Sequence, residues 1–201
     1  MEIINGIEQK GSPYTIEECS RDDLPKFFVQ MGYKIGAEIG VYKGINTKRY
    51  LDAGLKMYAI DPWHRRESYF KESFKLLDPY DDMCLIIREE SMSALRYFKD
   101  ESLDFVYIDG NHTFRYVAED IVEWSKKVKS GGVVSGHDYY NTGPNSKNVI
   151  CDVQCVVDAY IRANGIKNWY LFGRKKATGE ELKSSKWQRD NKWLSWLWIK
   201  E

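Results

Sequence analysis

The sequence predicts an α/β fold in which a mostly parallel sheet carries helices on both faces. Short apolar runs alternate with amphipathic, helix-like segments along most of the chain, as they do in strand–helix–strand units. The first clear example is the strand-like run Lys34–Ile39, a glycine-containing turn and the helix-like segment Ile45–Ala53. Near the end, Asn168–Phe172 and Trp193–Ile199 flank a polar, lysine-rich stretch, which predicts an antiparallel pair. The sheet should therefore end in one antiparallel strand.

Each element has a local signal. Asp22 and Asp23 before Leu24-Pro25 form a helix-start signal, so residues 1–32 are expected to be a helical or lid segment. Residues 33–201 are expected to form the core of the same single domain, with Gly131-Gly132 turning the chain into its fifth strand. We expect seven strands, at Lys34–Ile39, Met57–Asp61, Met83–Ile87, Leu103–Ile108, Val133–Gly136, Asn168–Phe172 and Trp193–Ile199. The helices between them are expected at Ile45–Ala53, Arg66–Leu77, Ser91–Phe98, Thr113–Val128 and, after a loop at Asn141–Asn148, Val149–Asn164.

Composition narrows the function classes. The 201 residues suffice for one well-filled domain. Lysine plus arginine and aspartate plus glutamate both total 30, so no net charge points to nucleic acid or an anionic membrane. No apolar run approaches the ~20 residues that a membrane span needs, and the start lacks a basic and then apolar signal pattern. The four cysteines show no metal or disulfide spacing. A cytoplasmic protein is expected.

The turn after the first strand is the most informative stretch. It reads Ala-Glu-Ile-Gly-Val-Tyr-Lys-Gly, and Glu38, Gly40 and Gly44 are its distinctive residues. Glycines allow the backbone to pass close to a bulky ligand, and the following helix offers unpaired N–H groups. The Gly-x-Gly-x-x-Gly dinucleotide fingerprint is absent. An acid at the strand end suits a cationic ligand better than a diphosphate, and S-adenosylmethionine carries both a sulfonium and an ammonium.

With the segments that follow it, this motif resembles the class I S-adenosylmethionine-dependent methyltransferases. The resemblance runs from about Arg21 to the C-terminus and is greatest to small O-methyltransferases, some of them metal-assisted, that act on sugars and natural products. It implies a Rossmann-like methyltransferase fold, S-adenosylmethionine as cofactor and a small-molecule or saccharide acceptor. A sugar hydroxyl is the first substrate expectation, by analogy with the family.

Two further polar residues follow strands where a nucleoside would lie. Asp61 ends the second strand, and an acid there hydrogen-bonds ribose hydroxyls in nucleotide-binding α/β folds. The alternative is that Asp61 caps the next helix. Ser91 follows the third strand, where similar enzymes read the adenine edge, and it is equally credible as a helix N-cap.

Two acids end the fourth and fifth strands, Asp109 and Asp138. Converging carboxylates repel each other unless positive charge lies between them, and Mg²⁺ would supply it. The pair resembles that of metal-assisted O-methyltransferases, whose Asp-Gly-x-His segment is matched by Asp109 to His112. The second site departs from that pattern, because His137 precedes Asp138, and histidine favours Mn²⁺ over Mg²⁺. Strand alternation also places His137 and Asp138 on opposite faces, so a shared ion stays open.

His112 is the predicted general base. Methyl transfer is an in-line displacement, and a hydroxyl becomes a competent nucleophile when a base takes its proton. Imidazole titrates near neutrality and can do this without a large shift in its pKa. The alternative is that His112 caps the helix beginning at Thr113 or packs against Trp124.

Together these residues predict a methyltransferase acting on an oxygen acceptor. Two other classes stay open, a nicotinamide-dependent oxidoreductase on a similar sheet and an inactive module that keeps the cofactor pocket as a scaffold. The tryptophans of the tail indicate packing in the core or against a second copy of the chain in a homodimer, rather than a sugar-stacking platform. The predicted catalytic residues are His112 and Asp109, the cofactor residues are Glu38, Gly40, Gly44, Asp61, Ser91 and Asp109, and the metal ligands are Asp109, Asp138 and His137.

Overall fold

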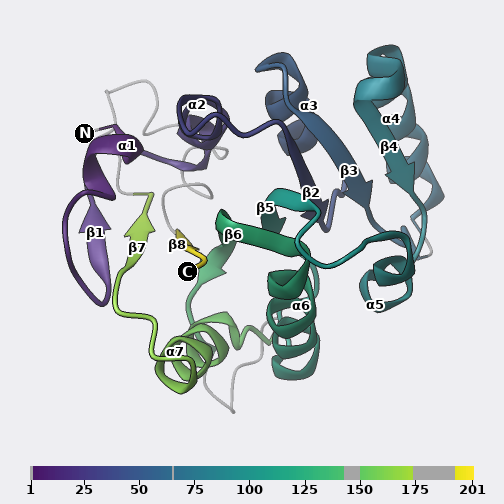
Figure 1. Ribbon diagram of the computed structural model, residues 1–201. Coiled ribbons are helices and arrows are strands. Elements are labelled where there is room, and N and C mark those ends of the chain that lie inside the picture. The colour runs from purple at the N-terminus through teal and green to yellow at the C-terminus, as the bar shows by residue number, and fades with distance from the viewer. Residues whose placement is uncertain (1, 65, 143–149, 174–192) are drawn as a thin grey trace, which may run out of the picture.

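The computed structural model describes residues 2–64, 66–142, 150–173 and 193–201. Within these residues, eight strands form a single sheet (Figure 1). The strands are β1 Tyr14–Ile16, β2 Ile35–Ile39, β3 Lys56–Ile60, β4 Cys84–Ile87, β5 Leu103–Ile108, β6 Val128–Tyr139, β7 Trp169–Phe172 and β8 Leu194–Ile199. Their order across the sheet is β1-β7-β8-β6-β5-β2-β3-β4.

The direction of the strands agrees with the prediction. β8 lies between β6 and β7 and runs antiparallel to both, with Leu197 opposite Ser135 on one side and Tyr170 on the other. All the other neighbouring strands are parallel. The sheet is therefore parallel except for its last strand in sequence, as the pattern of the tail indicated.

The predicted number of seven strands is wrong, because β1 adds an eighth. This three-residue strand pairs in parallel with β7, so that Tyr14 lies opposite Tyr170. The N-terminal segment is thus part of the sheet as well as helical. A strand of three residues at a sheet edge shows too little alternation to be recognised, and the residues that it pairs with come more than 150 positions later.

The helices lie close to their predicted positions. Two elements, one helix and one strand, differ from the prediction at their ends. The helix expected at Ser91–Phe98 is α-helical only to Ala94 and continues as a 3₁₀ turn. The strand expected at Val133–Gly136 is twelve residues long, because the two glycines form an irregularity within β6 instead of a turn before it. The bounds are α1 Ile3–Gly6, α2 Leu24–Gln30, α3 Ile45–Asp52, α4 Glu67–Leu77, α5 Ser91–Ala94, α6 Phe114–Lys127 and α7 Val153–Ala163, with 3₁₀ turns η1 Arg21–Asp23, η2 Asp78–Met83 and η3 Leu95–Tyr97.

Some predicted features fall outside the described residues. These are the start of the last predicted helix at Val149, most of the predicted loop Asn141–Asn148 and the polar stretch between β7 and β8. The described part of the last helix, α7, begins at Val153.

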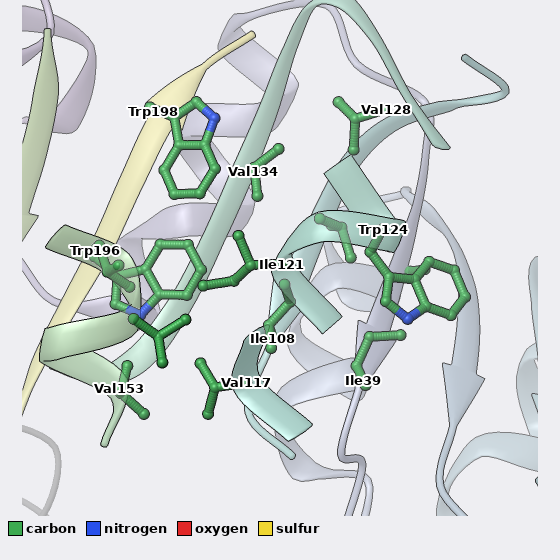
Figure 2. Packing of buried hydrophobic residues seen from close by; sticks show 14 of the residues in the cluster. Ile39, Ile108, Val117, Ile121, Trp124, Val128, Val134, Val153, Trp196 and Trp198 are labelled. Atoms are coloured by element: carbon green, nitrogen blue, oxygen red, sulfur yellow. The ribbon is translucent and has the colours of Figure 1, made fainter. Parts of the chain in front are cut away.

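The sheet separates two apolar cores. Helices α1 to α4 cover one face, and α5 to α7 cover the other (Figure 1). Along β5, Phe105 and Tyr107 point into the first core, whereas Val106 and Ile108 point into the second, as strand alternation requires. Figure 2 shows the second core, where α6 packs on the sheet through the residues Val117, Ile121 and Trp124.

The tryptophans of β8 belong to this second core. Trp196 and Trp198 are buried (Figure 2) and stack with ring centroids 5.3 Å apart. Leu197 points to the opposite face, into the first core. This confirms the packing role of these two tryptophans in the core.

The order of the strands places a switch point between β2 and β5. From β2 the chain proceeds outward through β3 to β4 and then returns to the other side of β2 as β5. In open α/β sheets, ligands bind outside the carboxyl ends of the strands at such a point. The glycine turn follows β2, and Asp109 follows β5, so the predicted motifs meet at this edge.

Candidate functional site

A cavity of about 650 Å³ opens at the carboxyl ends of β2, β3, β5 and β6. A smaller cavity of about 270 Å³ adjoins it, sharing Gly40, Tyr42 and Asp109 and reaching Glu38. Among the predicted site residues, the larger cavity is lined by Gly40, Asp61, Ser91, Asp109 and Asp138. Five of the site residues that the sequence predicted therefore lie together in the wall of one cavity.

The glycine turn is shaped by contacts within the protein. Gly40 has φ +90°, and a Cβ there would lie 2.2 Å from the carbonyl oxygen of Asp109. Gly44 has φ +80°, forms the N-cap of α3 and would place a Cβ 3.0 Å from Ser73 Oγ. Gly40 borders both cavities, whereas Gly44 is not among the described residues that line either of them. Close packing of strand ends and helices requires these glycines before any ligand is considered.

Glu38 is an almost fully buried acid at the end of β2, with 1% of its surface exposed. The Asn46 side chain donates to its Oε1 at 2.8 Å, and the Thr47 hydroxyl donates to its Oε2. Both donors come from the first turn of α3, so Glu38 ties the strand to the helix. Burial raises the pKa of Glu38 to about 7 against the effect of these two hydrogen bonds, which lower it.

Asp61 holds the turns around it. Its Oδ2 accepts a hydrogen bond from the backbone N–H of Tyr42 at 2.9 Å, and its Oδ1 accepts one from the N–H of Trp63 at 2.7 Å. Asp61 does not cap α4, which begins at Glu67. The side chain of Trp63 is buried and donates to the carbonyl oxygen of Tyr42 at 2.6 Å. Asp61 therefore links the glycine turn to the end of β3 in the cavity wall.

Ser91 begins α5 without capping it. Glu90 is the N-cap residue, and no side-chain hydrogen bond caps this helix. The Ser91 hydroxyl instead accepts from Trp124 Nε1 at 2.7 Å and donates to Asp120 Oδ1. Asp120 also lines the cavity and was not predicted from the sequence. The signal was available, because a charged residue interrupts the apolar face that α6 presents to the sheet.

The predicted catalytic residues form a compact charged cluster. Nε2 of His112 lies 3.5 Å from Asp109 Oδ1 and 3.2 Å from Asp138 Oδ2. His112 does not cap α6. The N-cap residue of α6 is Thr113, and the backbone N–H of Thr113 donates to Asn111 Oδ1. The structure therefore places the His112 imidazole where the sequence called for positive charge between two carboxylates.

The electrostatics of the cluster follow from this arrangement. Burial alone would lower the pKa of His112, but the nearby carboxylates of Asp109 and Asp138 outweigh it and raise the pKa. Burial alone would raise the pKa of Asp138. The hydrogen bond from His137 and the charges of His137, His112 and Arg21 hold it below its ordinary value.

His137 and Asp138 lie on the same side, contrary to the simple alternation expected of a strand. Asp138 has φ +56°, and the register between β6 and β8 shifts between Gly136 and Tyr139. This irregularity brings His137 Nδ1 to 3.0 Å from Asp138 Oδ1. The expectation that strand alternation separates His137 from Asp138 is therefore wrong, because a bulge re-aims the side chains.

Arg21 reaches the cluster from the N-terminal segment and is not among the site residues predicted from the sequence. Its Nη1 lies 3.2 Å from Asp109 Oδ2. The turn η1 that carries it is closed by a capping box between Ser20 and Asp23, and Asp22 pairs with Arg49 of α3 at 2.9 Å. The capping pattern is visible in the sequence, but Asp109, the partner of Arg21 in the site, lies 88 residues further along the chain.

A family described as a methyltransferase domain matches residues 37–139, from the middle of β2 to the end of β6. The chain belongs to this family. The match covers just over half of the chain and includes the glycine turn, Asp61, Ser91 and the cluster of Asp109 and Asp138. It confirms the predicted class, a S-adenosylmethionine-dependent methyltransferase.

Solved structures of methyltransferases share the fold. The O-methyltransferase TomG from Streptomyces achromogenes, in complex with S-adenosylmethionine, aligns with a TM-score of 0.64 and 14% identity over 90% of this chain and 79% of its own. An O-methyltransferase from Bacillus cereus, in complex with S-adenosylhomocysteine, aligns with a TM-score of 0.64 and 14% identity over 90% of this chain and 80% of its own. The N-methyltransferase NodS from Bradyrhizobium japonicum aligns with a TM-score of 0.60 and 11% identity over 89% of this chain and 95% of its own. These likenesses confirm the predicted fold, and they do not choose between oxygen and nitrogen acceptors.

A comparison with curated proteins gave no match. In the described part of the chain, no helix combines the length and the apolar character needed to cross a membrane. The homodimer and the cytoplasmic location stay predictions.

Proposed function

We propose that this methyltransferase moves the methyl group of S-adenosylmethionine to a hydroxyl oxygen of a sugar or a glycosylated small molecule. The observation that carries the proposal is the cluster of Asp109, His112 and Asp138 beside the cavity that the glycine turn borders. A base and two acids at the switch point of the sheet provide what a neutral hydroxyl needs to become a nucleophile. The choice of a sugar rests on the family resemblance of the Asp-Gly-x-His segment.

The cofactor would lie along the wall from Gly40 to Ser91. Asp61, at the end of β3, offers carboxylate oxygens for the ribose hydroxyls. Gly40 borders both cavities, so the methionine part would pass close to this backbone toward the smaller cavity that contains Glu38. Gly44 would contribute indirectly, by holding the N-terminus of α3 against α4.

His112 would accept the proton of the acceptor hydroxyl while the oxygen attacks the sulfonium methyl, leaving S-adenosylhomocysteine. Its side chain is 23% exposed and lies against two carboxylates of the cavity wall. The raised pKa makes neutral His112 a stronger base and reduces its neutral share at low pH. Turnover is therefore expected to increase as the pH rises through the pKa of His112.

The same carboxylates fit a divalent ion. Asp109, His137 and Asp138 each offer one ligand atom, and these atoms lie within 4.8 Å of one another. Among the described residues, Nε2 of His137 is buried without a hydrogen-bond partner, as is Nε2 of His112, so the His137 nitrogen is available to bind an ion. Two carboxylates with one imidazole suit Mn²⁺ better than Mg²⁺. When bound, the ion would lower the pKa of an acceptor hydroxyl.

Calorimetric titration with S-adenosylhomocysteine, with and without Mg²⁺ or Mn²⁺, tests the cofactor site. We expect micromolar binding to the native protein and its loss in Asp61→Ala. Asp100→Ala is the control, because Asp100 is an exposed acid that pairs with Lys127 away from the cavity. No binding under any condition would contradict the proposal, and titration with NADH would then test the oxidoreductase alternative.

Transfer of a labelled methyl group to a panel of hydroxylated sugars, glycosides and amines tests the acceptor. We expect label on hydroxyl groups and its loss in His112→Ala with cofactor binding retained. Label on amines alone would contradict the oxygen acceptor. Binding of the cofactor without transfer to any acceptor would favour the inactive scaffold.

A further inference from the structure

Asp120 is a nearly buried acid in the wall of the larger cavity. It lies on α6 between Val117 and Trp124, on the face that packs against the sheet, and only 4% of its surface is exposed. A carboxylate in such a position costs free energy unless hydrogen bonds compensate for its lost water. The contacts of Asp120 therefore show what it can do for a ligand.

A chain of hydrogen bonds fixes the direction of the donors around Asp120. The indole Nε1–H of Trp124 can only donate, and it donates to Ser91 Oγ at 2.7 Å. The single hydroxyl proton of Ser91 is directed to Asp120 Oδ1. Ser91 thus has no proton left to donate to a ligand, and Asp120 Oδ1 is already an acceptor.

The second oxygen of Asp120 is available. Within the described residues, Oδ2 makes no hydrogen bond, and it lies 3.5 Å from the point where a Cβ on Gly110 would be. Gly110 and Asp120 both line the cavity. Oδ2 therefore presents a hydrogen-bond acceptor at the end of the cavity that Ser91 borders.

The order of strands relates this acceptor to the proposed cofactor. Asp61 follows β3, and Ser91 follows β4, the next strand outward, so a nucleoside with its ribose at Asp61 would extend its base toward Ser91 and Asp120. We propose that Asp120 selects adenine by accepting a hydrogen bond from its exocyclic 6-amino group. This inference rests on the proposed function, because it assumes that the cavity holds the adenosine part of the cofactor.

The chemistry of the 6-position gives the selectivity. A 6-amino group donates to Oδ2, whereas the 6-oxo group of hypoxanthine would place an acceptor against an acceptor. Burial raises the pKa of Asp120 to about 7, while the hydrogen bond from Ser91 lowers it, so the ionised side chain gains from a further donor. A purely structural Asp120, linking α5 to α6, would not discriminate between the two bases.

The test compares the binding of S-adenosylhomocysteine and S-inosylhomocysteine by calorimetry at about pH 8.5, well above the pKa of Asp120 of about 7, so that no protonated Asp120 can donate to the 6-oxo group. For the native protein we expect at least about tenfold tighter binding of the adenine compound, the scale of a hydrogen bond to a charged group. In Asp120→Asn the amide oxygen can keep the bond from Ser91 and turn its N–H₂ toward the ligand. The preference should then shrink to within about threefold or reverse.

Glu119→Gln is the matched control, because it makes the same charge change one residue earlier, where the side chain pairs with Arg115. It should keep the native preference. Equal binding of both compounds by the native protein would overturn the inference while leaving the proposed cofactor intact, and an unchanged preference in folded Asp120→Asn would do the same. Failure of the native protein to bind either compound would overturn both proposals.

If Asp120→Asn does not fold, the native protein still tests the inference. The analogue with hydrogen at the purine 6-position lacks the donor but has no repelling oxygen. We expect it to bind more weakly than S-adenosylhomocysteine and more tightly than the inosine compound. Equal affinity of the analogue and S-adenosylhomocysteine would overturn the inference.

Discussion

Replacing Glu38 by glutamine should change how the stability of the protein depends on pH. Glu38 is buried at the end of β2 and accepts hydrogen bonds from Asn46 and Thr47. Glutamine has nearly the same shape, and its amide oxygen and N–H₂ can still bond to these two side chains. The variant therefore removes the titration of Glu38 with little change in packing.

The size of the effect follows from the pKa. In the folded protein the pKa of Glu38 is about 7, compared with an ordinary value of 4.5 for the unfolded chain. At roughly 1.4 kcal/mol for each pKa unit, this corresponds to about 3 kcal/mol. The folded state prefers protonated Glu38, so this contribution is fully present below pH 4.5, is lost as the pH rises from 4.5 to 7, and stays absent above pH 7.

Urea denaturation at several pH values between 4.5 and 8 would measure this contribution of Glu38 to the free energy of unfolding. The free energy of unfolding of Glu38→Gln minus that of the native protein should increase by about 3 kcal/mol over this range. Asp52→Asn is the control, because Lys48 and Tyr80 hold the pKa of exposed Asp52 below its ordinary value, so Asp52 is ionised throughout. A difference that is constant with pH for Glu38→Gln would refute the reasoning.

Three further predictions concern the site. Gly40→Ala should lower the free energy of unfolding by at least about 2 kcal/mol, because its Cβ would lie 2.2 Å from the Asp109 carbonyl oxygen at a positive φ; an unchanged urea curve would contradict this. His112→Gln should slow methyl transfer about 10²- to 10⁴-fold with cofactor affinity within twofold, whereas a parallel loss of both would indicate a structural role. After treatment with a chelator, Mn²⁺ should restore turnover better than Mg²⁺. Turnover that survives the chelator unchanged would remove the metal from the proposal.

The cluster around His112 shows why the metal and the base are closely linked. Its Nε2 lies within 3.5 Å of oxygens of both Asp109 and Asp138, which are also two of the three candidate ligands. Arg21 adds a second positive group against Asp109. The protein therefore has its own means of balancing two converging carboxylates, and the chelation experiment measures how much an ion adds.

The local pattern of the sequence was sufficient for seven of the eight described strands and for five of the residues that line the larger cavity. Alternation within Leu103–Ile108 is a property of neighbouring residues, and it survives folding because each face of that strand meets a different core. Asp61, Asp109 and Asp138 could be placed together because parallel strands bring their carboxyl ends to one edge. Their convergence needed only the identity and order of the strands.

The remaining features depended on residues that meet only in the folded chain. β1 exists because β7 offers it a partner, and Arg21 enters the site because its turn is tied to α3. Asp120 becomes a cavity residue through Ser91 on another helix. The positive φ of Asp138 turns its side chain toward His137 against the alternation of the strand. Local sequence carries periodicity and turn preferences, whereas the pairing of distant segments and the backbone irregularity at β6 were decided by tertiary packing.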